Sequence, residues 1–210
     1  MKSTMKPIAL LATLLVAAWS LQAQVVETTT YDDGRVYTGQ RSGKGKIEGK
    51  GLMTWPNGDR YDGEWKKGVM DGEGTYTYAA AGYSYTGQWV KGNIKGHGTF
   101  RFNNGNVMEG DWTSAGNGTG YLLFADGTRY DGPFLSGAPH GQGVKIWANG
   151  DRYEGTFVQG HLTGQGTMQF ADGTRYEGGW LNDQYEGQGT LTIPGQEPIS
   201  GRFVNGKYQN

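Results

Sequence analysis

Gly-x-Gly motifs are the first residues whose types and spacing could form a functional site, because a glycine-rich loop can bind a phosphate or a dinucleotide. Gly-x-Gly recurs at seven equivalently spaced places, Gly49/Gly51, Gly72/Gly74, Gly96/Gly98, Gly118/Gly120, Gly141/Gly143, Gly164/Gly166 and Gly187/Gly189. A dinucleotide loop needs one such motif between a buried strand and a helix, and no helical pattern follows any of these. Seven equivalent copies indicate a structural role in something periodic.

Charged side chains are the second candidate, since two carboxylates can serve as general acid and base. An arginine and a carboxylate flank a tyrosine four times, as Arg60 with Asp62, Arg129 with Asp131, Arg152 with Glu154 and Arg175 with Glu177. Four equivalent pairs favour a solvated ladder of ion pairs over one catalytic site.

No other pattern of catalytic or metal-binding residues is present. His97, His140 and His161 stand at three different positions of the repeat described below, so they do not build a shared metal ligand set. The sequence also has no Gly-x-Ser-x-Gly, Walker loop or His-Glu-x-x-His motif. We therefore expect no catalytic residue, no metal and no cofactor, and we expect that the chain is not an enzyme.

The composition narrows the class of protein. Glycine accounts for 39 residues, with 13 Tyr and 7 Trp, which is unlike a disordered or Leu-rich helical chain. The 19 basic and 20 acidic residues give a net charge of -1, so no nucleic acid partner is expected. The absence of Cys excludes disulfides and thiolate metal sites.

The first residues are typical of a secretory signal peptide. Lys2 and Lys6 precede an apolar run over residues 8–19, and small residues follow up to Ala23. The arrangement predicts a signal-peptide helix over 1–23, cleavage after Ala23, and export to the periplasm or the outside of the cell, with association to the envelope as a further expectation. A retained anchor is the alternative, although a run of about 12 residues is short of the ~20 that span a bilayer.

An internal repeat must position the remaining residues, and it decides the fold. An aromatic-x-Gly-x-aromatic element begins at intervals of 22 to 24 residues, at Tyr37, Tyr61, Tyr85, Met108, Tyr130, Tyr153, Tyr176 and Ile199. Seven full copies and one truncated copy fill residues 37–210, and residues 24–36 form an N-terminal segment with the end of a degenerate copy.

Each copy predicts a β-hairpin. Its first strand alternates aromatic, Gly and aromatic at positions 1, 3 and 5, and its second strand places apolar residues at positions 16 and 18. Asn-Gly or Asp-Gly follows, which is typical of a type I′ turn; these pairs are Asn57-Gly58, Asn104-Gly105, Asp126-Gly127, Asn149-Gly150 and Asp172-Gly173. We expect an all-β fold, a twisted, elongated, single-layer antiparallel meander of about sixteen strands, roughly 75 Å long.

The frame resembles the MORN (membrane occupation and recognition nexus) repeat, YxGxWxxGxxxGxG, over roughly 170 residues, with the exported bacterial type as the expected kind. A few positions depart from the pattern, namely Arg41 and Phe134 in place of Trp, Met108 and Ile199 in place of Tyr, and Asp183 in place of a loop glycine. The resemblance implies an elongated single-layer sheet. It also implies contacts with proteins, membranes or phosphoinositides.

Alternation places the Arg and carboxylate pairs on one face and the rings on the other. The expected binding residues are those rings, Tyr61, Trp65, Tyr85, Trp89, Trp112, Tyr130, Tyr153, Phe157, Tyr176 and Trp180. A one-layer sheet has no second layer to cover them, so half-exposed rings would give a patch on the order of 1,000 Å². The intervening glycines are expected to leave room for rings of adjacent copies.

The function that these observations favour is an exported, non-enzymatic scaffold that binds an unknown protein partner or a second copy. A membrane phospholipid or phosphoinositide is an alternative, based on Lys44, Lys46, Lys50, Lys66 and Lys67. A glycan or cell-wall polymer is a third, since rows of Tyr and Trp suit sugar stacking.

One local irregularity adds a docking hypothesis. Leu123 and Ile146 stand at position 17, which is mostly polar in the other copies, and Pro133 replaces a polar residue nearby. Either these residues make the charged face apolar at mid-array and create a docking spot, or they reflect sequence drift.

Overall fold

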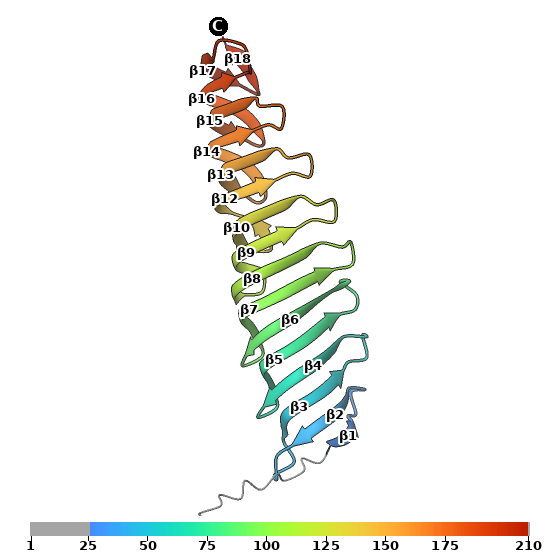
Figure 1. The fold of residues 1–210 in the computed structure, drawn as a ribbon. Coiled ribbons are helices and arrows are strands. Elements are labelled where there is room, and N and C mark those ends of the chain that lie inside the picture. Colours follow the sequence, from blue (N-terminus) through green and yellow to red (C-terminus); the bar gives the residue numbers. More distant parts are fainter. Residues whose placement is uncertain (1–25, 210) are drawn as a thin grey trace, which may run out of the picture.

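The computed structural model describes residues 26–209, and within this range the chain forms one open antiparallel sheet of 18 strands without a helix (Figure 1). The strands are β1 (Val26–Thr30), β2 (Val36–Arg41), β3 (Ile47–Thr54), β4 (Arg60–Lys66), β5 (Val69–Tyr78), β6 (Tyr83–Val90), β7 (Asn93–Phe102), β8 (Val107–Ser114), β9 (Asn117–Leu123), β10 (Arg129–Leu135), β11 (Ala138–Pro139), β12 (Gly141–Ile146), β13 (Arg152–Val158), β14 (His161–Gln169), β15 (Arg175–Leu181), β16 (Gln184–Thr192), β17 (Ile199–Val204) and β18 (Lys207–Gln209).

The sheet is a meander, because each strand pairs with its neighbours in the chain. The pairings run from β1–β2 to β17–β18, and β11 and β12 share the position beside β10. The predicted all-β, single-layer architecture is confirmed. The two strands beyond the expected sixteen are β1 and the short β11. Figure 1 shows a twisted ribbon with the hairpin loops along its two long sides.

Two predictions concern residues near the N-terminus, namely the signal peptide and the end of a degenerate copy in residues 24–36. The signal-peptide helix and the cleavage after Ala23 lie outside the described residues. The loop after β1 belongs to the second prediction. The loop after β1 closes with Tyr31 N–H donating to Arg35 O and Gly34 N–H donating to Tyr31 O. The Asn-Gly loop at Trp55 closes with the same pair of hydrogen bonds.

The turn assignment needs a correction. At Asn57-Gly58 only the glycine has a positive φ, of 88°, and Gly58 N–H donates to Trp55 O while Trp55 N–H donates to Asp59 O. This is a three-residue loop with a glycine bulge, and not the predicted type I′ turn. Asn57 Oδ1 instead accepts from Asp59 N–H, 3.0 Å away, the side-chain cap that favours Asx residues in turns. Glycine alone also has the positive φ in the other four Asn-Gly and Asp-Gly loops.

Turns with two positive φ values lie at the opposite side of the ribbon. Lys67-Gly68 has φ values of 53° and 86°, and similar pairs recur at Lys91, Ser136, Gln159, Asn182 and Asn205 with the residues that follow them. These loops are linked along the ribbon, since Gly92 N–H donates to Met70 O and Gly206 N–H donates to Tyr185 O.

A β-bulge follows the glycine of the first strand in most copies. The register shifts between Gly63 and Trp65, for example, where β4 pairs with β5, and between Gly178 and Trp180, where β15 pairs with β16. A bulge bends its strand and increases the local twist. Because the bulge recurs at the same position, it bends the hairpins of these copies in the same way.

A ladder of rings forms the core. Tyr153 packs edge-on between Phe157 and Trp180, with ring centroids 5.2 Å from each, and Tyr61 is similarly placed between Trp65 and Trp89. Edge-to-face contacts of this kind stabilise aromatic pairs beyond their buried area. In five copies the tyrosine at position 1 therefore contacts the position-5 ring of the next copy, as Tyr37, Tyr61, Tyr130, Tyr153 and Tyr176 do.

Polar atoms of these rings have partners in the backbone. Tyr153 Oη donates to Thr156 O, and the indole of Trp180 donates to Gly166 O in the preceding copy at 3.2 Å. Trp65, Trp89 and Trp112 make the equivalent bond to the copy before them. Buried donors are thereby satisfied, and successive copies are tied together.

The packing of the rings explains the Gly-x-Gly motifs. Gly164 has a φ of 62°, a backbone conformation that glycine adopts without strain. A Cβ on Gly166 would collide with the ring of Tyr153, which lies over the backbone of its own copy. We expected rings of adjacent copies in that space, and this detail was wrong.

Candidate functional site

The ten predicted binding rings are buried. Tyr61, Tyr85, Tyr130, Tyr153, Phe157 and Tyr176 are 0% exposed, and Trp65, Trp89, Trp112 and Trp180 are at most 6% exposed. The expected patch of half-exposed rings at these positions is therefore wrong. The edge-on packing of neighbouring copies covers each ring without a second layer. Direct contact of a partner with these ten residues stays a prediction.

The accessible rings come from position 18 of the second strand. We call them the aromatic rim: Trp55, Tyr78, Phe102, Phe124, Trp147 and Phe170, one from each of the first six copies. All six are partly exposed, and five of them pack against the buried core. Position 18 was recognised as an apolar column of the second strand, but alternation alone did not show that it lies at the edge of the packed rings.

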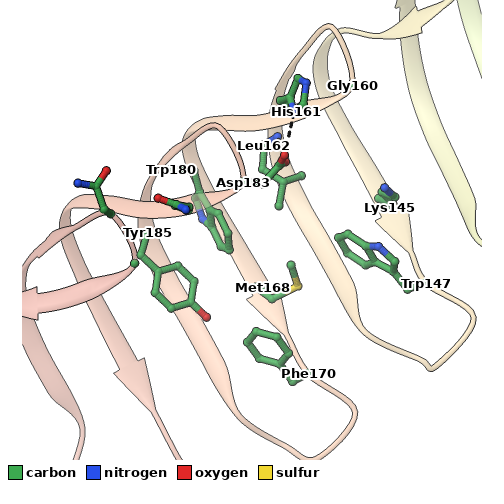
Figure 2. Close-up of a pocket in the computed structure, with 13 residues that line it drawn as sticks. Lys145, Trp147, Gly160, His161, Leu162, Met168, Phe170, Trp180, Asp183 and Tyr185 are labelled. Carbon is green, nitrogen blue, oxygen red and sulfur yellow. Dashed lines mark hydrogen bonds and ion pairs between the residues drawn. The ribbon is translucent and has the colours of Figure 1, made fainter.

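A groove of about 580 Å³ opens on this face near the C-terminal end (Figure 2). Trp147 and Phe170 lie on one side of it, and the loops at His161 and Asp183 lie on the other. Met168, Leu162 and Trp180 line it between the two sides. We call it the C-terminal groove. Its lining is mainly apolar with a few polar groups, as is usual for a binding site.

The polar residues that line the groove are Lys145, His161, Asp183, Gln184 and Asn205. His161 Nδ1 lies 2.7 Å from Asp183 Oδ2, and Leu162 N–H donates to Asp183 Oδ1. Burial alone would raise the pKa of Asp183, but these two hydrogen bonds hold it below its usual value. Asp183 therefore belongs to the loop structure, and its carboxylate is already partnered.

Lys145 is the functional candidate that our sequence reasoning missed. It takes position 16 of the fifth copy, a position that is apolar in the other full copies. Its Nζ lies 4.7 Å from the ring of Trp147 and 5.7 Å from that of Phe124. Burial lowers the pKa of Lys145, partly offset by the charges of Asp183 and Asp126. The break in an otherwise apolar column was the available signal.

A second groove of about 380 Å³ lies on the same face at mid-array. Phe100, Phe102 and Tyr83 line one side, and the loops at Gly116 and Gly137 line the other. The two grooves use equivalent parts of the repeat. The rim and the loops therefore border a hollow that recurs along the ribbon.

The opposite face carries the predicted charged ladder. Arg129, Arg152 and Arg175 pair with Asp131, Glu154 and Glu177 at 2.5 to 2.6 Å. No salt bridge joins Arg60 to Asp62 within residues 26–209. The partners are 42% to 60% exposed, so each pair contributes ~0 to 1 kcal/mol. Leu123 and Ile146 lie on this face beside Arg129, 39% and 40% exposed, and whether a partner docks there stays a hypothesis.

The histidines of the described residues do not gather into one cluster. Between residues 26 and 209, no three His, Asp or Glu side chains come together in a way that could hold a metal ion. His140 Nδ1 is buried without a hydrogen bond there. His97 lies at the surface between Glu109 and Asp111. Over the same range, no helix is long and apolar enough to cross a membrane.

Comparison with known families identifies the repeat. The family model described as MORN repeat matches residues 43–60, 61–80, 85–107, 130–152, 153–175 and 176–196, together more than half of the chain. No curated protein matches the sequence.

Comparison with solved structures finds matches at low identity. The TCP10 domain of Danio rerio CPAP is 15% identical with a TM-score of 0.51, and the match covers 84% of this chain and 83% of that one. The G-box domain of the microcephaly protein CPAP is 14% identical, with coverage of 86% and 100% and a TM-score of 0.47. The TCP domain of Drosophila melanogaster SAS-4, solved with a proline-rich motif of Ana2, is 16% identical, with coverage of 95% and 96% and a TM-score of 0.38. The first likeness concerns the fold alone, and the other two are too distant to bear on what this chain binds.

Proposed function

The chain belongs to the MORN repeat family, and from this premise we propose that it is an exported, non-catalytic scaffold that holds a partner protein along its aromatic rim. The observation that carries the proposal is the pair of grooves bordered by partly exposed rings on one face of a one-layer sheet. Open hollows at two places along one face of the ribbon suit an extended ligand better than a compact one. A second copy of the chain is one such partner.

Two alternatives receive less support. The lysines that suggested a lipid headgroup lie among carboxylates, since Lys50 stands opposite Glu64 in the sheet and Glu48 accepts from Lys67 N–H. A basic cluster of the kind that binds anionic membranes is therefore not formed there. No arrangement of the described rim residues favours a glycan over a peptide.

Photocrosslinking tests the proposed surface. With a photoreactive phenylalanine analogue in place of Trp147, irradiation of producing cells is expected to give discrete protein adducts, because the partner covers the rim. The same analogue at Gln165, exposed on the charged face, is the matched control. An adduct of twice the chain mass identifies a homodimer. Equal adducts from both positions, or none from Trp147, would contradict the proposal.

Export is the second part of the proposal and is tested separately. In a bacterial host, the chain recovered from the periplasm is expected to begin at Gln24, which intact mass measures directly. Leu14→Arg interrupts the apolar run and is expected to leave residues 1–23 attached and the chain inside the cell. Recovery of uncleaved wild type in the membrane fraction would favour the retained anchor.

A further inference from the structure

We propose that the aromatic rim binds a proline-rich segment in the polyproline II conformation, laid along the ribbon with one ligand turn per repeat. The inference rests on the proposed function, because it names the chemistry of the partner segment. The C-terminal groove and the rim rings Phe124, Trp147 and Phe170 are the assigned site.

The spacing of the rim rings matches the length of one polyproline II turn. Successive rim rings are separated by two strands, or about 9.6 Å at the usual strand separation. The side-chain geometry agrees: Lys145 Nζ lies 5.7 Å from Phe124 and 4.7 Å from Trp147, so these rings are no more than about 10 Å apart. A polyproline II helix has three residues per turn and rises about 9.3 Å per turn. Every third ligand residue therefore meets a ring.

The free hydrogen-bonding groups of the rim also suit such a segment. The core tryptophans donate to backbone carbonyls, but over residues 26–209 the indoles of Trp55 and Trp147 and the ammonium of Lys145 have no hydrogen-bond acceptor. Their nitrogen atoms are not among the buried atoms without a partner in this range, so they reach solvent. Trp147 and Lys145 thus offer free donors on the rim side of the groove, whereas the acceptors Asp183, Gln184 and Asn205 come from its loop side. A proline-rich segment has free carbonyl acceptors and few N–H groups, and it is complementary to such a surface.

Other extended ligands fit less well. A β-strand repeats the same face about every 6.8 Å, which does not coincide with the ring spacing. An α-helix uses its own carbonyls internally and cannot accept from the rim. The sheet twists by about 20° per strand, so the match holds over a few copies and not over the whole ribbon. A ligand of about nine residues, covering three rings, is the expected length.

Indole NMR signals give a test with an internal control. On titration of the purified chain with nonaproline, the Trp147 indole N–H signal is expected to shift saturably, and the signals of Trp65, Trp89 and Trp112, which lie outside the C-terminal groove, to stay in place. Triproline covers one ring and is expected to bind at least about tenfold more weakly. The absence of a Trp147 shift, or an equal shift with a Gly-Ser nonapeptide, would overturn the inference.

Two variants test the site assignment while keeping the core intact. Trp147→Phe keeps the ring and removes the donor, and Lys145→Met restores an apolar residue at position 16. Each is expected to weaken nonaproline binding about three- to tenfold with unchanged thermal unfolding, and unchanged affinity in both would overturn the assignment. If crosslinking through Trp147 persists while nonaproline fails to bind, the partner is not a polyproline II segment and the proposed function stands.

Discussion

Gly166→Ala is expected to destabilise the protein by about 3 kcal/mol or more, which lowers the unfolding temperature by about 10 °C for a chain of this size. The added methyl would meet the Tyr153 ring. That ring cannot move aside, because it is fully buried between Phe157 and Trp180. Thermal unfolding followed by circular dichroism measures the loss.

Two other glycines separate the steric effect from backbone conformation. At Gly68 a Cβ meets nothing within 4 Å, but φ is 86°, so Gly68→Ala is expected to cost only about 1 kcal/mol. At Gly43 a Cβ again meets nothing and φ is ordinary, so Gly43→Ala is expected to change stability by less than about 0.5 kcal/mol. Equal effects at Gly166 and Gly68 would show that the ring does not fill the space assigned to it.

Local destabilisation should also change how the array unfolds. Each repeat contacts only its neighbours, and the stability of such an array is the sum of repeat and interface contributions. Gly166 lies in the sixth copy, so its replacement weakens the C-terminal copies and leaves the N-terminal ones intact. We expect the Gly166→Ala transition to broaden or split into two steps.

The strands could be predicted from sequence because their determinants are local. The alternation of Tyr153, Gly155 and Phe157 against Arg152, Glu154 and Thr156 assigns each residue to a face without knowledge of the rest of the chain. The ion pair of Arg152 with Glu154 confirms this assignment.

The exposure of each ring could not be predicted in the same way, because it depends on the curvature of the strands. Tyr153 and Trp147 both lie on the aromatic face, yet Tyr153 is fully buried and Trp147 is partly exposed. The difference arises from the bulges, which bend the strands, and from Trp180, which reaches back over the preceding copy. Alternation predicts the face of the sheet on which a residue lies, but not how far the residue is from the edge of the packed rings.

The prediction of type I′ turns was wrong for a related reason. Asn-Gly is a strong signal for a type I′ turn when two residues close the hairpin. Here three residues close each hairpin, as residues 56–58 do between Trp55 and Asp59, and in this bulged loop only the glycine has a positive φ. Lys67-Gly68, with a less distinctive sequence, has the two positive φ values instead.

The same buried rings make the fold sensitive to alkali. Burial raises the pKa of Tyr85, Tyr130, Tyr153 and Tyr176 to about 12, against 10.0 for a free tyrosine. Between pH 10 and 12 the unfolded chain has lost these protons while the folded chain still binds them. Stability therefore falls as pH rises through this window, and the contribution of the four groups is fully present below pH 10.

We expect phenolate absorbance at 295 nm to rise together with the loss of the circular dichroism of the sheet, because the four buried tyrosines ionise only towards pH 12. Tyr153→Phe keeps the ring packing and removes one titrating group, so its stability should fall less steeply over the same interval than that of the wild type. The variant also loses the hydrogen bond to Thr156, which costs about 1 kcal/mol at every pH. Only the slope of stability against pH therefore reports on ionisation. Complete ionisation by pH 10.5 with an unchanged sheet signal would show that the tyrosine ladder is open to water, and the assignment of binding to the rim rather than to the ladder would then have to be reversed.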